Sequence, residues 1–224
     1  EICSKDTSLA YLCEISNINE NIEAKILQKL EKNKESTLHI NIVQALPKAD
    51  KMEFIIQKCT ELGVKEFTPL SLKRCVVKID SKDEQKKILK WQKQAEVASK
   101  QCGRDIIPTV NKIYNINALQ DLLKDYDLVL LAYESEENNT LKSEIEKLNK
   151  KDASIAVIIG PEGGLEEAEV EYLKQNGARV VTLGNRILRT ETAGMAIVSI
   201  LQYALRGFRK LIIDILKHNS IKLF

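Results

Sequence analysis

The chain has 224 residues, 44% of them hydrophobic, which suits one large domain or a medium domain with a smaller companion. Its 34 lysines and arginines against 32 aspartates and glutamates leave a formal net charge of +2, so any RNA contact has to come from a local patch rather than from global basicity. The five cysteines include no Cys-x-x-Cys pair and only two histidines are present, which argues against a disulfide framework and a metal site and fits a reducing cytoplasm.

The first 46 residues alternate polar and apolar side chains in short bursts. The bursts cover residues 9–15, 22–27 and 37–43. This pattern is typical of a small β domain, although the third burst is alternatively the first strand of the next unit. The chain begins with Glu1 inside a strand pattern and without a methionine, so we expect an N-terminal piece to be missing. Neither a signal peptide nor an apolar run of the roughly 20 residues that span a bilayer is found, so we expect a cytoplasmic protein without membrane contact.

From Pro47 the pattern changes to helical spacing, which predicts a helix over residues 48–62 that stops at Gly63. The domain boundary is therefore expected near residues 44–47, which gives domains of residues 1–46 and 47–224. Strands are then predicted over residues 64–70, 75–79 and 107–113. A long charged helix is predicted over residues 82–102, ended by Gly103.

The second half of the chain alternates apolar strands with helices. The predicted strands are residues 128–132, 155–159 and 179–183. The predicted helices are residues 139–150, 165–176 and 191–206. Near-continuous apolar strands alternating with helices predict an α/β fold with a mostly parallel sheet covered on both faces. The amphipathic tail, residues 211–224, indicates one more helix or a loosely packed extension.

Two loops near the C-terminus combine glycine with charge, and each follows an apolar strand and precedes a helix. Residues 159–165 read Ile-Gly-Pro-Glu-Gly-Gly-Leu, and residues 183–193 read Leu-Gly-Asn-Arg-Ile-Leu-Arg-Thr-Glu-Thr-Ala. Both are expected at the edge of the sheet where the strands end, which is where open α/β sheets bind small ligands. Glycine lets a ligand approach the backbone, and the helix that follows offers unpaired N–H groups.

The first loop does not suit a polyphosphate, because it lacks a Lys-Ser/Thr pair and its helix begins with acids. These acids are Glu166, Glu167 and Glu169. The alternative is a purely structural glycine turn. For the second loop, the alternative is a surface turn in which Arg189 and Glu191 pair. Thr190 or Thr192 is expected to cap the helix after it.

Arg104 follows the expected helix end and has only Asp105 as a nearby acid, so it is free to meet a phosphate or a base edge. A structural role for Arg104 is equally open. The lysines of residues 82–100 are better explained as a solvated helix face. His39 and His218 are better explained as structural residues.

The two loop sequences, in this order and at this distance, resemble the RsmE-type RNA methyltransferases of the SPOUT superfamily. The similarity extends through residues 47–53, 58–64, 91–104 and 130–134, so it covers nearly the whole chain. This resemblance implies a PUA-like β-barrel domain, here truncated, at residues 1–46. It implies a methyltransferase domain with a C-terminal trefoil knot at residues 47–224.

The same resemblance implies methylation of N3 of a uridine in 16S ribosomal RNA, with S-adenosylmethionine as the methyl donor. It also implies a homodimer whose chains pair across the site and a 30S ribosomal particle as the partner. The alternatives are a non-catalytic RNA-binding protein that kept the fold, or methylation at another RNA position. The chain departs from the family by having Asn185 where proline is usual, by lacking the first strands of the β domain, and by its tail beyond about residue 209.

The roles that the resemblance implies fall on three groups of residues. The residues expected to bind the cofactor are Leu131, Ala132, Gly160, Glu162, Gly163, Gly164, Leu183, Gly184 and Leu188. The residues expected to act in catalysis are Arg104, Arg189 and Glu191, with Glu162 as the alternative base. The residues expected to contact RNA are Lys48, Lys51, Arg104 and Arg186. No metal is expected.

Overall fold

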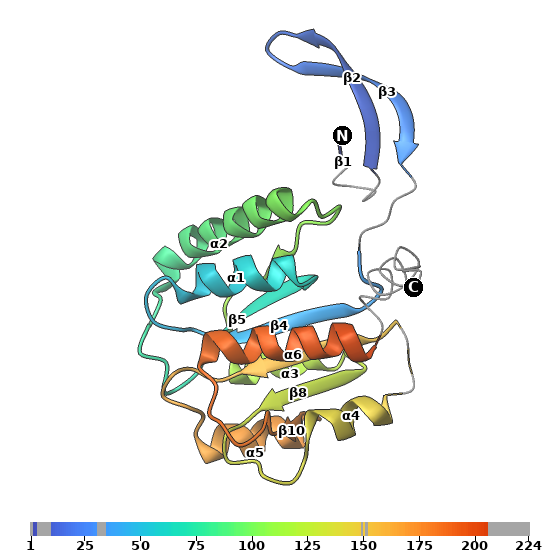
Figure 1. The fold of residues 1–224 in the computed structure, drawn as a ribbon. Helices are drawn as coiled ribbons and strands as arrows, with labels where there is room; N and C mark the ends of the chain where they lie inside the picture. The colour runs from blue at the N-terminus through green and yellow to red at the C-terminus, as the bar shows by residue number, and fades with distance from the viewer. Residues whose placement is uncertain (1, 4–9, 31–34, 149, 151, 206–224) are drawn as a thin grey trace, which may run out of the picture.

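The structure, a computed structural model, describes residues 2–3, 10–30, 35–148, 150 and 152–205. The described residues form two sheets (Figure 1). The first is a three-stranded antiparallel sheet in the order β1-β2-β3. Its strands are β1 (Ile2–Cys3), β2 (Ala10–Ile18) and β3 (Ile22–Leu30). The predicted tail at residues 211–224 lies outside the described residues.

The second sheet has seven strands in the order β10-β8-β9-β4-β5-β6, with β7 also paired to β5, and every pairing in it is parallel. Its strands are β4 (His39–Ala45), β5 (Glu66–Ser71), β6 (Thr109–Val110), β7 (Tyr114–Asn115), β8 (Leu128–Ala132), β9 (Ser154–Ile159) and β10 (Arg179–Val181). Nearly every residue of β4 and β9 is buried, as expected for strands covered on both faces. The predicted parallel α/β sheet is therefore confirmed.

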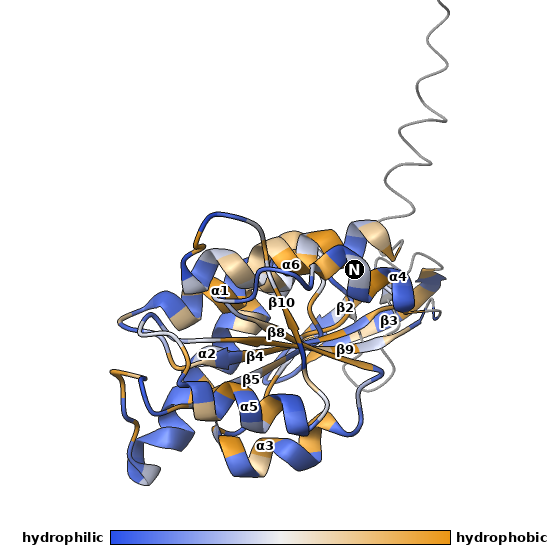
Figure 2. Cartoon of the chain, turned by 90° about the horizontal axis from the view of Figure 1, so that it is seen from below, coloured by the Kyte–Doolittle hydropathy of each residue, from blue (hydrophilic) through white to orange (hydrophobic). Residues whose placement is uncertain are grey.

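Helices cover both faces of this sheet. They are α1 (Lys51–Glu61), α2 (Ser81–Cys102), α3 (Ile116–Leu123), α4 (Leu141–Lys147), α5 (Glu167–Gln175) and α6 (Thr190–Ala204). Figure 2 shows α1 and α6 on one face and α3 and α5 on the other, with the apolar strands between them. The core is one continuous cluster of buried side chains from the strands and from the inner faces of these helices.

Strand β4 places the start of the parallel sheet before the predicted boundary at residues 46 and 47. It pairs with β5 on one side and with β9 on the other, so it lies in the middle of the sheet. The alternative interpretation of the burst at residues 37–43, as the first strand of the next unit, is therefore the one that the structure shows. A buried apolar strand has the same local sequence pattern in an N-terminal β domain and in a parallel sheet. Only its pairing shows to which sheet it belongs.

Two strand predictions were wrong. Residues 75–79 form an irregular segment, in which Cys75 is buried and Lys78 Nζ donates to the carbonyl oxygen of Leu72 at 3.0 Å. The strand predicted over residues 107–113 shrinks to the two residues of β6, and α3, which had no predicted counterpart, lies beyond it. Short alternating runs can result from a single packed side chain, without a β ladder.

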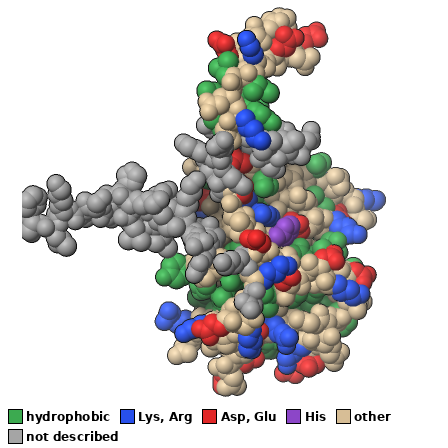
Figure 3. Space-filling model, turned by 90° about the vertical axis from the view of Figure 1, so that its right-hand side faces the viewer, with side chains coloured by type: hydrophobic (Ala, Val, Ile, Leu, Met, Phe, Trp, Pro, Cys, Tyr) green, Lys and Arg blue, Asp and Glu red, His purple; other side chains and the backbone are tan. Residues whose placement is uncertain are grey.

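The surface carries charges of both signs. On the face shown in Figure 3, cationic and anionic side chains are interspersed below the β2–β3 hairpin, without a continuous basic patch. The hairpin itself exposes apolar side chains on both strands. These are Leu12, Ile15, Ile18, Ile22, Ile26 and Leu27.

Candidate functional site

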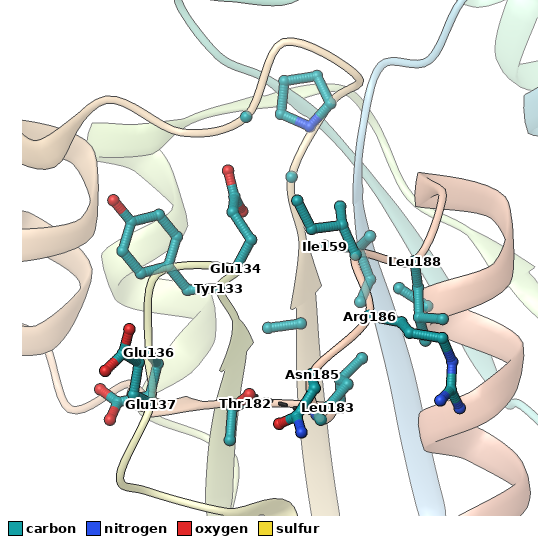
Figure 4. Close-up of a pocket in the computed structure, with 17 residues that line it drawn as sticks. Tyr133, Glu134, Glu136, Glu137, Ile159, Thr182, Leu183, Asn185, Arg186 and Leu188 are labelled. Carbon is teal, nitrogen blue, oxygen red and sulfur yellow. Dashed lines mark hydrogen bonds between the residues drawn. The ribbon is translucent and has the colours of Figure 1, made fainter.

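A pocket of about 420 Å³ lies where β8, β9 and β10 end (Figure 4). Its volume falls within the range of small-molecule sites, and its position is the one at which open parallel sheets bind ligands. The lining residues are Ala132, Tyr133, Glu134, Glu136, Glu137, Ile159, Gly160, Pro161, Gly164, Thr182, Leu183, Gly184, Asn185, Arg186, Ile187, Leu188 and Ala193. Both predicted glycine loops therefore contribute to one pocket.

The loops are joined through Thr190. Its hydroxyl donates to the carbonyl oxygen of Gly160 at 2.7 Å and accepts from Nε2 of the buried Gln44 at 2.8 Å. The expectation that Thr190 or Thr192 caps α6 was wrong, because Arg189 is the N-cap residue and makes no capping side-chain bond. Instead, the Thr190 hydroxyl connects the start of α6 to the first loop and to the end of β4.

Two glycines are required by the shape of the first loop. A Cβ at Gly160 would lie 2.7 Å from Cδ1 of Leu165. Gly164 has a φ of +70°, and a Cβ there would lie 2.7 Å from Oε1 of Glu134. Any other residue at these positions would disturb the packing of the loop or fill the edge of the pocket.

The pocket has an apolar wall and an acidic wall. Figure 4 shows Ile159, Leu183 and Leu188 on one side and the carboxylates of Glu136 and Glu137 on the other. The backbone N–H groups of Asn139 and Asn138 donate to Glu136 at 2.9 Å and lower the pKa of that carboxyl group. The carboxyl group of Glu136 is therefore ionised at neutral pH, and this wall favours a ligand with an apolar body and a positive charge.

Six of the residues predicted to bind the cofactor line the pocket, and three do not. The six are Ala132, Gly160, Gly164, Leu183, Gly184 and Leu188. Leu131 is fully buried in the core, because alternate residues of β8 face opposite sides of the sheet. Gly163 packs against Arg74, and Glu162 turns towards α1. Asn185, at the usual proline position, lines the pocket.

Lys51 connects the acidic residues of the two loops. Its Nζ lies 3.0 Å from Oε1 of Glu162 and 3.2 Å from Oε2 of Glu191, and the backbone N–H of Lys48 donates to Glu162 at 3.1 Å. Burial opposes ionisation of Glu162, but the bonds from Lys51 and from backbone N–H groups outweigh it and lower its pKa. The same two carboxylates raise the pKa of Lys51. The alternative pairing of Arg189 with Glu191 is not formed.

Arg186 and Arg189 have exposed side chains. Arg186 lines the pocket on the side opposite Glu136 and Glu137, as Figure 4 shows. Within the described part of the chain, neither arginine makes a side-chain hydrogen bond or an ion pair. Lys48 is also exposed. These cations are available to a phosphate or to a base edge.

The expectation that Arg104 is isolated from acids was wrong. Its Nη2 lies 2.7 Å from Oε2 of Glu35, and its Nη1 donates to the carbonyl oxygens of Thr60 and Val64 at 3.0 and 2.6 Å. The side chains of Arg104 and Glu35 are only 7% and 6% exposed. Glu35 precedes β4 and Val64 precedes β5, so Arg104 lies near the N-terminal ends of the parallel strands. The pocket lies at the opposite, C-terminal ends of the strands. The partners of Arg104 support the structural role that the sequence left open for it.

The acids after the first loop have structural partners. Glu169 accepts from the backbone N–H of Glu166 and from that of Lys73, both at 2.9 Å, and Lys73 Nζ lies 2.9 Å from Glu166. Arg74 Nη1 donates to the carbonyl oxygen of Gly163 at 3.3 Å. The segment after β5 therefore supports the first loop.

Sequence reasoning missed Glu136, Glu137 and Arg74 as neighbours of the site. The signal for the two glutamates was available, because an acidic run follows the strand over residues 128–132 at the same edge of the sheet. Arg74 was missed because a strand was wrongly predicted over residues 75–79, directly after it.

No group of three or more His, Cys, Asp or Glu side chains that could hold a metal ion is found in the described part of the chain. Among the described helices, none has the length and apolar character needed to cross a membrane.

Comparison with known proteins gives a consistent set of similarities. A family model for an RNA methyltransferase domain matches residues 34–202. The ribosomal RNA small subunit methyltransferase E of Bacillus subtilis is 35% identical over 206 residues, which covers 90% of this chain and 80% of that protein. The protein of the same name from Mesomycoplasma hyopneumoniae is 31% identical over 177 residues, covering 79% of this chain and 75% of that protein.

A solved structure is also similar. It is the crystal structure of a ribosomal RNA small subunit methyltransferase E from Neisseria gonorrhoeae bound to S-adenosyl methionine. The TM-score is 0.79 and the sequence identity 30%, over 90% of this chain and 82% of that chain.

Proposed function

Because the chain belongs to the RNA methyltransferase family, we propose that it transfers a methyl group from S-adenosylmethionine to N3 of a uridine in 16S ribosomal RNA. The observation that carries this proposal is the pocket that the two glycine loops build together at the ends of β8, β9 and β10. It contains no Lys-Ser/Thr pair for a polyphosphate, and its acidic wall suits a cation.

The residues of the pocket fit S-adenosylmethionine. The apolar wall of Ile159, Leu183 and Leu188 gives a planar base a surface to pack against, and Gly160 and Gly184 leave backbone groups accessible. Glu136 and Glu137 favour the positive charge of the sulfonium group. When bound, the cofactor supplies an electrophilic methyl group.

We assign the binding of the RNA substrate mainly to residues of the second loop. The exposed guanidinium groups of Arg186 and Arg189 would bind RNA phosphate or stabilise negative charge on the uracil oxygens, together with Lys48. Glu191 is the proposed base for the N3 proton, because Glu162 turns towards α1, where it accepts from the backbone N–H of Lys48 and pairs with Lys51. Lys51 holds both carboxylates and so positions the two loops.

The direct test is methyl transfer to 30S particles from cells that lack the gene, followed by nucleoside mass spectrometry of the 16S RNA. The expected product is 3-methyluridine at one position. Another methylated nucleoside would move the activity to a different RNA position. Cofactor binding without any transfer would favour a non-catalytic RNA-binding protein.

The proposal includes a PUA-like RNA-binding domain spanning residues 1–46, to which the N-terminal sheet belongs. Strand β4 lies within this range but pairs in the parallel sheet. It is supported by the antiparallel pairing of β1, β2 and β3, and by the exposed Lys25 and Lys29 on β3. The double variant Lys25→Glu/Lys29→Glu should bind 16S RNA more weakly and with a shallower salt dependence. Unchanged binding would remove β3 from the RNA interface.

The proposal also includes the trefoil knot. Its support is that β10 pairs with β8, while α6 returns to pack against β9 and α1. A crystal structure traced without a break through residues 128–204 tests the threading.

A homodimer is proposed from the outer face of α6. Ile200 is 44% exposed and Tyr203 70% exposed on this helix, and Ile187 in the preceding loop is 83% exposed. An apolar surface next to the pocket suits a second copy that completes the site. Ile200→Glu should shift the protein to a monomer in light scattering, whereas Leu89→Glu on the exposed face of α2 should not.

The setting that we propose is the cytoplasm, on an assembled 30S particle. Support comes from the cysteines whose side chains the structure describes, which are all free thiols: Cys13, Cys59, Cys75 and Cys102.

A further inference from the structure

Opposite charges face each other across Gly164 at the edge of the pocket. The Cβ position of Gly164 lies 2.7 Å from Oε1 of Glu134 and 3.9 Å from Nη1 of Arg74. Glu134 lines the pocket, whereas Arg74 comes from the segment that supports the first loop. The two side chains nevertheless do not form an ion pair with each other, and in the described part of the chain Glu134 makes no other side-chain hydrogen bond or ion pair.

Other contacts of the protein keep the side chains of Arg74 and Glu134 apart and leave the space between them open. Arg74 is held by the carbonyl oxygen of Gly163 at 3.3 Å and has Oε1 of Glu166 at 3.8 Å from its Nε. The left-handed backbone of Gly164 excludes a side chain that would fill the space. Both charged side chains are exposed, so a ligand can reach them.

The arrangement of these positive and negative side chains favours one class of ligand over others. A phosphate bound to Arg74 would lie close to two carboxylates, those of Glu134 and Glu166, which repel it. A simple cation at Glu134 would lie close to the guanidinium group. A zwitterion that carries an ammonium and a carboxylate on one carbon satisfies both side chains at once.

We propose that Arg74 and Glu134 bind the amino-carboxylate end of S-adenosylmethionine, with Arg74 contacting the carboxylate and Glu134 the ammonium group. This inference rests on the proposed function and adds two binding residues to it. It predicts that the site distinguishes the complete cofactor from adenosine thioethers that lack the amino acid.

The test is isothermal titration calorimetry with two probes, S-adenosylhomocysteine and 5′-methylthioadenosine, because only the first carries the amino-carboxylate group. Arg74→Gln and Glu134→Gln should each weaken binding of S-adenosylhomocysteine by about 10- to 100-fold, the effect of losing a hydrogen bond to a charged group. Binding of 5′-methylthioadenosine should change less than twofold. The matched control is Lys86→Gln, which removes an exposed positive charge on α2, outside the pocket lining, and should leave both affinities unchanged.

The other outcomes are distinguishable. Unchanged binding of S-adenosylhomocysteine in both variants overturns the inference, and so does an equal loss for both probes, which would indicate a collapsed pocket. If Arg74→Gln weakens only the binding of RNA, Arg74 belongs to the RNA interface and the inference is wrong. If the wild-type protein binds neither probe, the proposed function itself fails, and this inference fails with it. Arg74→Lys, which keeps the charge but not the planar guanidinium, should recover part of the affinity.

Discussion

The hydroxyl of Thr190 donates a hydrogen bond of 2.7 Å to the carbonyl oxygen of Gly160. This bond joins the start of α6 to the loop that follows β9, although the two residues are 30 positions apart in the chain. The same hydroxyl accepts from Gln44, at the end of β4. One side chain therefore fixes the two glycine loops of the pocket relative to the centre of the sheet.

Replacing Thr190 with valine keeps the shape of the side chain and removes both hydrogen bonds. The carbonyl oxygen of Gly160 and the amide of the buried Gln44 then lose a partner, which is expected to lower the free energy of unfolding by about 1–3 kcal/mol. Cofactor affinity should fall as well, because the loops are no longer joined. Urea denaturation and calorimetry measure the two effects. Thr109→Val, at an exposed position on β6, is the control.

Lys51→Met tests the connection between Glu162 and Glu191. Without the ammonium group the two carboxylates repel each other, so the loops should shift and the rate of methyl transfer should fall by about 10- to 100-fold. Lys51→Arg keeps the positive charge and should retain more activity than Lys51→Met. Lys58→Met removes a lysine of α1 that pairs with Glu61, and should have little effect. Equal activities of Lys51→Met and the wild type would contradict a positioning role.

The elements that were predicted best from the sequence have a pattern that lies within their own residues. Residues 128–132 form one continuous apolar run, and β8 occupies those same residues. The long helix ends at Gly103, whose φ of 68° is the left-handed conformation that favours glycine after a helix. The two loops were recognised because glycine and charge at a strand end are visible without knowing the fold.

The errors concern contacts between distant parts of the chain. Arg104 has only one nearby acid in the sequence, and its true partner, Glu35, lies 69 positions away. The ion pairs of Lys51 with Glu162 and Glu191 likewise join residues that lie far apart in the chain. Local patterns do not encode which strand ends become neighbours, so such ion pairs had to come from the structure.

Arg104→Met tests the structural role assigned to the buried ion pair. The variant leaves the carboxylate of Glu35 buried without its guanidinium partner, so we expect a loss of about 3–5 kcal/mol in the free energy of unfolding. The double variant Arg104→Met/Glu35→Leu should regain much of the loss. Cofactor affinity of the folded protein should not change, because the pair lies at the opposite edge of the sheet. A stable Arg104→Met protein without methyl transfer would restore the catalytic role.

Thiol labelling should separate the cysteines by burial. Cys59 is fully buried, and burial raises the pKa of its thiol to about 12, whereas Cys102 is exposed at the end of α2. Because the thiolate is the reactive form, iodoacetamide at pH 8 should modify Cys102 in the native protein and spare Cys59. Peptide mass spectrometry measures the ratio, and labelling in urea provides the unfolded reference. Rapid native labelling of Cys59 would contradict the packing of α1.

Asp127 should make stability depend on acid pH. Bonds from Lys150 and from the backbone and hydroxyl of Ser154 lower the pKa of Asp127 from 3.8 to about 2, and so join the start of β8 to that of β9. Since the pKa is lower in the folded state, its stabilisation is present above the unfolded pKa and is lost as the pH falls through the folded pKa. Asp127→Asn should therefore be less stable than the wild type near pH 6, and the difference should shrink between about pH 4 and pH 2. Urea denaturation across this range, with Glu20→Gln at the exposed hairpin turn as the control, measures it. A difference that does not depend on pH would show that the charge of Asp127 contributes nothing to stability.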